Sequence, residues 1–196
     1  MKRAVPPLLV GALVLGAGDA QAHLVNSGFG PFYDGLAHPF LVPEDLLPLI
    51  AATLLAGLRG ARCGRAVLCA LPLAWLAGMA AAALIDLPSG PVWASCALTI
   101  ALGVSVAADR RWPVAVVTAV ASLAGATHGF ANGRELVAVH SGMLAMAGVA
   151  CTVFVMSALI AGQVATLRAH WARVAVRAGG SWIAAIGLLM FGWAMR

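Results

Sequence analysis

Long apolar runs alternate with short polar segments along most of this chain. Runs of this length are typical of helices that cross a lipid bilayer. The first run is sixteen residues long and contains Pro48, so we expect it to be kinked, tilted or too short for a full crossing. Pro43 suits the first turn of that helix. The six predicted spans cover about 43–58, 66–85, 92–108, 113–130, 136–167 and 179–195.

The first 22 residues have the pattern of a secretory signal peptide. Lys2 and Arg3 precede a short apolar core at 8–18, and a small-x-small sequence follows at 20–22. The short core and two early prolines favour cleavage over an uncleaved anchor helix. In either case, the chain that follows begins outside the cytoplasm.

These patterns predict three parts and an all-α fold. Residues 1–22 are the signal peptide, and 23–42 form a polar periplasmic segment that has no helical period. Residues 43–196 form a polytopic membrane bundle of six transmembrane helices. We expect the 23–42 segment to lie on the outer membrane face, over the ends of the helices.

Composition supports a membrane protein and excludes other classes. Hydrophobic residues make up 62% of the chain and charged residues 10%, whereas a soluble domain has about a quarter charged residues. The mean hydropathy is +0.96. The net charge of +5 comes from arginines in short loops, and no basic stripe is interleaved with aromatics, so no nucleic-acid partner is expected.

The arginines also predict the orientation of the helices. With the mature N-terminus outside, eight arginines fall in inner loops and two on the outer side, as the positive-inside rule requires. We therefore predict a protein of the bacterial inner membrane with a periplasmic N-terminus. Asp109 and His170 fall among the inner arginines and are expected to be solvated. The inner arginines are Arg59, Arg62, Arg65, Arg110, Arg111, Arg168, Arg173 and Arg177.

The four cysteines do not suggest a disulfide framework or a thiolate site. No C-x-x-C pair occurs, and three of the four fall inside apolar runs, where cysteine usually packs as a small residue. They are Cys63, Cys69, Cys96 and Cys151.

Two polar clusters stand out, because ionisable groups in a membrane core are rare and usually functional. The stretch 35–47 holds His38, Glu44 and Asp45, and the stretch 126–133 holds His128 and Asn132. The topology places both clusters at the outer ends of their helices. Imidazole with oxygen donors suits nickel, cobalt, zinc or copper, so the clusters predict one shared metal site.

Spacing indicates how the second cluster is presented. His128 and Asn132 are four residues apart, so they share one face of a helix. Gly125, Gly129 and Gly133 repeat at the same spacing on a neighbouring face. Such a ladder of small residues allows close helix approach, so we expect a partner helix packed there. An alternative is that His128 only forms a hydrogen bond across a helix pair.

The remaining candidates each have two interpretations. Glu44 and Asp45 point about 100° apart, so one faces the site, while the other orients a ligand or caps the helix dipole. His140, just over one turn into the fifth helix, is a ligand or a core histidine. His23 would offer an amine and an imidazole to a metal if cleavage follows residue 22. Asp86 is expected in a turn.

The two clusters resemble the signatures of a known family. The H-P-x-x-x-x-E-D run at 38–45 resembles the H-P-x-x-G-x-D-H signature of the HupE/UreJ proteins, and H-G-x-x-N-G at 128–133 resembles their H-G-x-x-H-G. The resemblance implies a nickel or cobalt permease that serves hydrogenase or urease, with His38 and His128 as metal ligands. The resemblance also implies a metal-binding role for Glu44, Asp45 and Asn132. Each signature lacks one histidine here, which implies a divergent branch richer in oxygen donors.

The sequence therefore predicts uptake of a divalent transition metal, with nickel or cobalt favoured over copper or zinc. A transporter is expected rather than an enzyme, although no acid near the inner helix ends completes a relay. The alternatives are a metal-binding membrane enzyme or assembly factor that does not transport, and a purely structural subunit. The expected partners are the metal ion and the lipid bilayer, and the sequence leaves open a homo-oligomer.

Overall fold

The computed structural model describes residues 28–85, 87, 90–138 and 142–196. Within these ranges the chain forms seven helices and no strand, which confirms the all-α prediction. The signal peptide predicted at 1–22 lies outside the described residues. The helices are α2 (Pro31–Leu41), α3 (Pro43–Leu58), α4 (Ala61–Leu84), α5 (Val92–Ala108), α6 (Val114–Ala138), α7 (Gly142–Ala165) and α8 (His170–Ala194).

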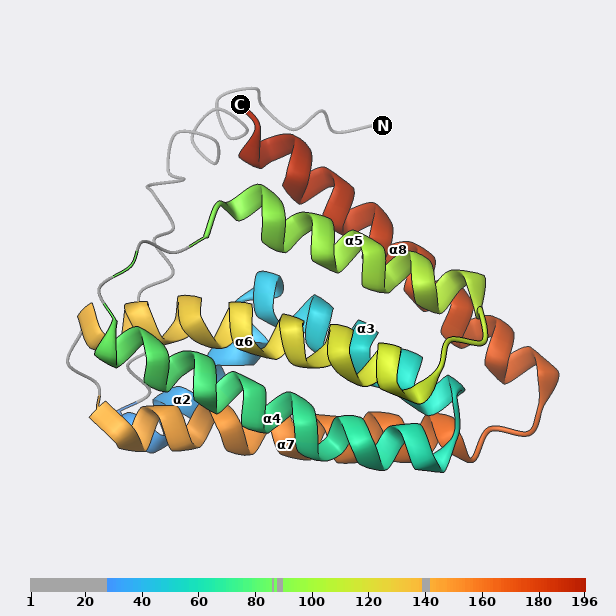
Figure 1. Ribbon diagram of the computed structural model, residues 1–196, viewed down its shortest axis with the longest axis horizontal. Helices are drawn as coiled ribbons and strands as arrows, with labels where there is room; N and C mark the ends of the chain where they lie inside the picture. The colour runs from blue at the N-terminus through green and yellow to red at the C-terminus, as the bar shows by residue number, and fades with distance from the viewer. Residues whose placement is uncertain (1–27, 86, 88–89, 139–141) are drawn as a thin grey trace, which may run out of the picture.

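Helix α3 is the centre of the bundle, although it was predicted as the shortest span. It contacts each of the other six described helices. Its side chains are buried over most of its circumference, with Leu49, Ala52 and Leu55 at most 3% exposed. A helix that is apolar on all sides is stable only where other helices cover it. Figure 1 shows α3 lying behind α6, between the α5–α8 pair and the α4–α7 pair.

The other helices pack chiefly in three pairs, which are α4 with α6, α5 with α8, and α2 with α7. The glycine ladder on α6 explains the closest pair. A Cβ atom added at Gly129 would lie 2.1 Å from the backbone oxygen of Trp75 on α4. Only hydrogen at this position lets the two backbones approach so closely. The predicted packing of the ladder against a partner helix is confirmed, and the partner is α4.

Length and composition show a membrane protein. Four helices are long and apolar enough to cross a bilayer, namely α4, α6, α7 and α8. Helices α2 and α3 pass the same test as a pair bent by 75°, and α5 is a shorter apolar helix. The predicted bounds of α3 and α5 are confirmed. Helices α4 and α8 begin earlier than predicted, because they continue into arginine-bearing turns that hydropathy alone does not detect.

One expectation for the N-terminal segment is wrong. The stretch 23–42 was expected to have no helix, but its described part contains α2. Pro31 occupies the first turn of α2, where a missing N–H costs nothing. A Cβ at Gly35 would lie 2.1 Å from the backbone oxygen of Ala145, so α2 is held by close packing on α7. The segment thus belongs to the bundle, and its helicity depends on tertiary contact rather than on local pattern.

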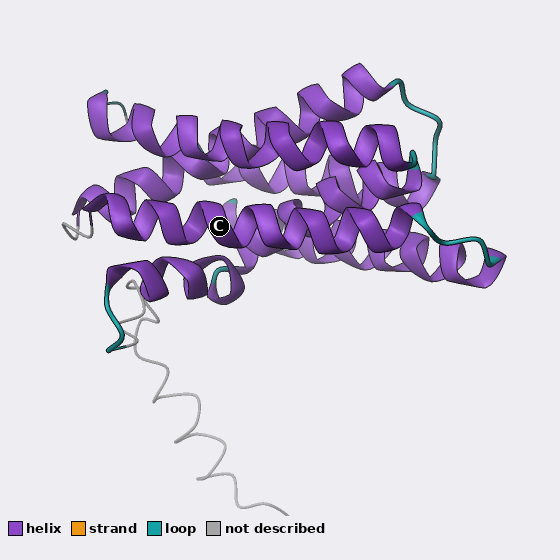
Figure 2. Cartoon of the chain, turned by 90° about the horizontal axis from the view of Figure 1, so that it is seen from below, coloured by secondary structure: helices purple, strands orange, loops and turns teal. Residues whose placement is uncertain are grey.

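The bundle has two ends that differ in chemistry. The histidine end contains the break between α2 and α3 at Val42, and the arginine end contains the connections at 59–60, 109–113 and 166–169. Figure 2 shows the helices lying alongside one another with their connections at the two ends. The assignment of the histidine end to the periplasm stays a prediction.

Candidate metal centre

Three helices bring four polar side chains together at the histidine end. His38 is in the last turn of α2 and Asp45 in the first turn of α3, on either side of the break. His128 and Asn132 come from one face of α6, as their spacing predicted. None of the four is more than 3% exposed. The extended backbone at Val42 (φ −106°, ψ 99°) turns the chain so that His38 and Asp45 face the same space.

The carboxylate of Asp45 is the hub of this cluster. Its Oδ1 lies 3.1 Å from Nδ1 of His128. Its Oδ2 accepts a hydrogen bond from Nδ2 of Asn132 at 2.7 Å and lies 3.4 Å from Nε2 of His38. A buried carboxylate requires partners of this kind, because isolated burial of a charge is costly. With both imidazoles neutral, the cluster carries a net negative charge.

His128 is oriented for ligation by the carboxylate. An ionised carboxylate only accepts hydrogen bonds, so Nδ1 of His128 carries the proton. In the neutral imidazole, Nε2 then has a free lone pair, and this atom is buried with no hydrogen-bond partner in the described part of the chain. The same relay of carboxylate to imidazole fixes the tautomer of histidines that bind metals.

Trp75 on α4 fixes the two residues from α6, and the sequence did not single it out. Its ring stacks on His128 with centroids 5.8 Å apart, and its Nε1 donates to Oδ1 of Asn132 at 2.8 Å. The amide NH₂ of Asn132 must therefore face Asp45 and His38, with Nδ2 at 3.2 Å from Nε2 of His38. A tryptophan in a buried apolar helix needs an acceptor for its N–H, and this was the available signal.

Glu135 is a second residue that sequence reasoning did not select. It lies on α6, three residues after Asn132 and so on nearly the same face. Its Oε2 is 3.9 Å from Nε2 of His38, and its side chain is 53% exposed. Glu135 thus stands at the rim of the cluster, between solvent and His38.

The remaining candidates are placed as follows. Asp45 faces the cluster, whereas Glu44 is exposed, so the expectation that only one of the two acids faces the site is confirmed. His23, His140 and Asp86 lie outside the described residues. Among the residues that the structure describes, no three His, Cys, Asp or Glu side chains are grouped closely enough to hold a metal ion. The amide of Asn132 occupies the space between the carboxylate and His38.

Comparison with models of protein families shows to which family the chain belongs. The family model described as HupE / UreJ protein matches residues 11–190. This match covers nearly the whole chain and includes every residue of the cluster. The chain belongs to the HupE/UreJ family. Comparisons with curated proteins and with solved structures gave no match.

Family membership sets the class of function. HupE/UreJ proteins are associated with nickel or cobalt transport and with urease and hydrogenase maturation. The apolar helices agree with a membrane location. For this HupE/UreJ protein, handling of a transition metal is therefore the general expectation, and the buried cluster of His38, Asp45 and His128 offers the matching donor chemistry.

A second ionic cluster lies at the arginine end, and it corrects an expectation. Asp109 was expected to be solvated, but its side chain is only 18% exposed and pairs with both Arg59 and Arg173. Nη2 of Arg173 lies 2.9 Å from Oδ2 of Asp109, and Arg59 also donates to the backbone oxygen of Asp109. The sequence placed the charges at this end correctly, but it could not show that three connections converge there. The described end of α8 leaves His170 exposed, as expected.

Proposed function

We propose that this HupE/UreJ protein carries a divalent transition metal, nickel or cobalt in preference to copper or zinc, across the bacterial inner membrane from the periplasm. The ion is the cargo, and His38, Asp45 and His128 receive it. The observation that carries the proposal is the buried Nε2 of His128, oriented by Asp45 and without a partner in the described ranges. Such an atom is stabilised by a metal ion, which accepts its lone pair.

The charge of the cluster favours a cation. Asp45 is 2% exposed and is hydrogen-bonded to His128 and Asn132, while Nε2 of His38 lies 3.4 Å from its Oδ2. In the tautomer of His38 whose Nε2 accepts from Nδ2 of Asn132, that nitrogen also holds a lone pair. One buried negative charge with two imidazole lone pairs is an unfavourable arrangement by itself. A divalent ion would offset it.

The spacing of two of the donors, His38 and Asp45, also suits one ion. Two donors bound to the same ion at about 2.1 Å lie about 3.0–3.4 Å apart. The separation of 3.4 Å between Nε2 of His38 and Oδ2 of Asp45 falls in this range. Because the NH₂ group of Asn132 fills part of the same space, loading requires the amide to turn away or to present its oxygen.

The side chains between the cluster and the arginine end indicate how transport must proceed. Leu49, Leu55 and Val153 close the core with at most 3% exposure. The buried hydroxyls of Thr53 and Ser157 donate to carbonyls of their own helices. Because the apolar side chains around them are closely packed, an ion can leave toward the arginine end only after the helices move. The break at Val42 and the proline within α3 are the places where such movement meets the least resistance.

The same apolar core favours a second candidate function. A protein that binds the metal at the histidine end and hands it to a partner on the same side needs no passage through Leu49 and Leu55. In this case the chain is an assembly factor that serves urease or hydrogenase maturation without transport.

The test compares uptake and binding. Vesicles containing the full-length protein are incubated with radiolabelled nickel or cobalt, and binding to the purified protein is measured by equilibrium dialysis. We expect His38→Ala and His128→Ala to abolish both. His170→Ala is the matched control, because His170 is exposed at the opposite end and should leave both unchanged.

Three outcomes separate the candidates. Uptake by the wild type that is lost in both cluster variants supports transport. Stoichiometric binding without uptake supports the assembly factor and excludes transport. If wild-type protein neither binds nor takes up nickel or cobalt, the cluster has a structural role, and the proposal is wrong.

A further inference from the structure

The arginine end contains a cavity that the metal proposal does not use. Its volume is about 580 Å³, and it is open to solvent. Three arginines and one acid supply most of its polar lining. The lining residues are Leu58, Arg59, Asp109, Arg111, Trp112, Val114 and Arg173.

The charges of this cavity do not balance. Three guanidinium groups face one carboxylate, so the lining carries a net charge of +2 (three positive charges less one). Asp109 pairs with Arg59 and Arg173. Arg111 has no ion pair with any residue in the described ranges. The side chain of Arg59 is only 7% exposed, and its buried Nε has no hydrogen-bond partner there. The cavity is therefore suited to an anion with several acceptor oxygens.

An apolar groove begins where the charged cavity ends. Trp112 lines both the charged cavity and a second cavity of about 150 Å³ along the seam between α5 and α6. The seam exists because α5 packs mainly on α8, while α6 packs mainly on α4. The lining of this second cavity is almost wholly apolar, from Leu55, Ala101, Ser105, Trp112, Val116, Val117 and Val120.

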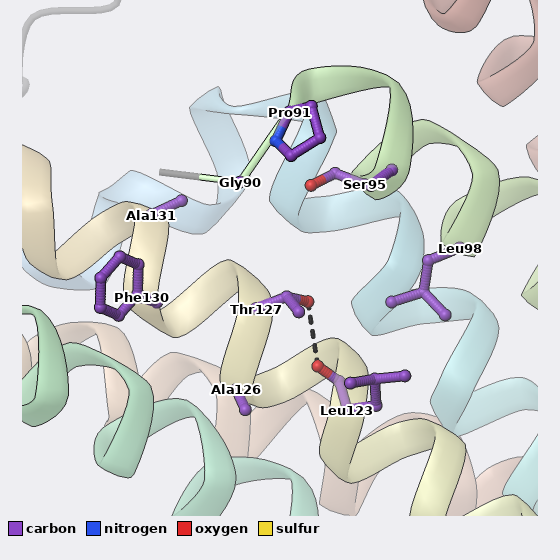
Figure 3. Close-up of a pocket in the computed structure, with 10 residues that line it drawn as sticks. Gly90, Pro91, Ser95, Leu98, Leu123, Ala126, Thr127, Phe130 and Ala131 are labelled. Carbon is purple, nitrogen blue, oxygen red and sulfur yellow. Dashed lines mark hydrogen bonds between the residues drawn. The ribbon is translucent and has the colours of Figure 1, made fainter. Parts of the chain in front are cut away.

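The same seam continues toward the histidine end. Leu98 and Leu123 lie about one helical turn beyond Ala101 and Val120, and they line a further apolar cavity of about 540 Å³. Figure 3 shows this cavity between α5 and α6, where Leu98 and Leu123 face each other and the hydroxyl of Thr127 is turned back to the carbonyl of Leu123. The hydroxyl is thus satisfied within its own helix, which leaves the groove apolar.

We propose that the α5–α6 seam binds an anionic phospholipid, with the phosphate among Arg59, Arg111 and Arg173 and an acyl chain along the apolar groove. Charge at one end and an apolar channel leading from it match a lipid of this class. Basic pockets between membrane helices bind lipid headgroups in this way. Trp112 is 39% exposed at the junction, and tryptophan prefers the boundary between headgroups and hydrocarbon.

The experiment uses native mass spectrometry of the full-length protein in a neutral detergent. Phosphatidylglycerol and phosphatidylcholine with the same acyl chains compete for the protein, and glycerol 3-phosphate is the probe for phosphate alone. We expect Arg111→Gln to lower phosphatidylglycerol retention about fivefold, the value for one arginine near an anionic lipid surface. This variant leaves both ion pairs of Asp109 intact, so its folding is not at risk.

Arg110→Gln is the matched control. It removes the same charge from the adjacent position, but Arg110 lies over the ring of Trp112 and does not line the cavity. Ala101→Phe fills the groove without touching the charges, and it should lower retention of the lipid. Equal loss in the two arginine variants would overturn the proposal, since it would indicate only a basic surface. So would glycerol 3-phosphate binding as tightly as the lipid, with no effect of Ala101→Phe, because the ligand would then be a free phosphate.

Discussion

Each end of this bundle holds one acid shared between neighbours, and the two acids are balanced in opposite ways. At the arginine end, Asp109 is paired with the cationic Arg59 and Arg173. At the histidine end, Asp45 is bonded only to groups that can be neutral, among them Asn132 and His128. The acid of the first cluster has two cationic partners within the protein, whereas the acid of the second has no partner with a permanent positive charge. Asp109 therefore joins helices, and on the proposed function Asp45 receives the cation.

The largest expected effect is on stability and comes from Asp109→Asn. The substitution leaves the guanidinium of Arg59, which is 7% exposed, without its counter-ion. Breaking a buried pair in this way costs about 3 kcal/mol. For a chain of this length, the apparent melting temperature in detergent should fall by about 6–12 °C. Arg173→Gln should cost less, because Arg173 is 37% exposed and remains solvated in either case.

The same substitution at Asp45 should have a small effect on stability and a large effect on metal affinity. Asp45→Asn removes a charge whose partners carry no permanent positive charge, so the loss of stability should be only about 1 kcal/mol. Affinity for nickel or cobalt, measured by equilibrium dialysis, should fall by at least about 100-fold, because the anionic ligand and the group that orients His128 are lost together. Asp109→Asn is the control and should keep its metal affinity. A large loss of stability with unchanged binding in Asp45→Asn would contradict the comparison.

Sequence reasoning recovered most of this architecture because membrane helices are defined by length and apolar character. The bounds of α3 and α5 follow directly from their apolar runs. The ladder of Gly125, Gly129 and Gly133 predicted a close helix partner, although only the structure identifies α4. The helix α2 was missed, since its stability depends on contact between Gly35 and α7 and no local periodicity reveals it.

The candidate site shows the same limit at the level of single residues. Topology placed His38, Asp45 and His128 at one depth. Because successive residues of a helix point about 100° apart, only one of the two adjacent acids could face the histidines. The sequence could not choose Asp45 over Glu44, because the direction of the chain after the break at Val42 decides which acid points inward. Trp75 was missed for a related reason: it belongs to α4, and its role appears only once α4 and α6 are packed.

A smaller effect should come from Trp75→Phe, and its direction is informative. Phenylalanine keeps an aromatic ring against His128 but cannot donate to Oδ1 of Asn132. The amide is then free to turn its oxygen toward Asp45, where a metal ion would sit. Since one neutral hydrogen bond contributes about 1 kcal/mol, metal affinity should rise about fivefold. Equilibrium dialysis with nickel and cobalt measures the change.

The control for this prediction is Asn132→Ala, which removes the amide itself. If the amide NH₂ opposes the ion, Asn132→Ala should also bind more tightly than wild type, although with lower stability because Asp45 loses a hydrogen bond. Weaker metal binding in both variants would mean that Asn132 is itself a ligand. The present orientation of its amide would then not represent the loaded site.

The smallest expected effect separates capture of the ion from its binding. Glu135 is half exposed at the rim, 3.9 Å from His38, and the charge of its carboxylate attracts a divalent cation toward the buried cluster. Glu135→Gln should slow nickel or cobalt association about two- to threefold at low ionic strength, and the difference should vanish as salt is raised, because screening removes such steering. Stopped-flow measurement of metal binding gives both the rate and its salt dependence.

Glu44→Gln is the control. Glu44 is an exposed acid at the same end of the bundle, but it does not contact the cluster, so the effect of Glu44→Gln should be smaller at every salt concentration. Equal effects of the two variants would show that the general charge of this end attracts the ion and that Glu135 has no special place on its path.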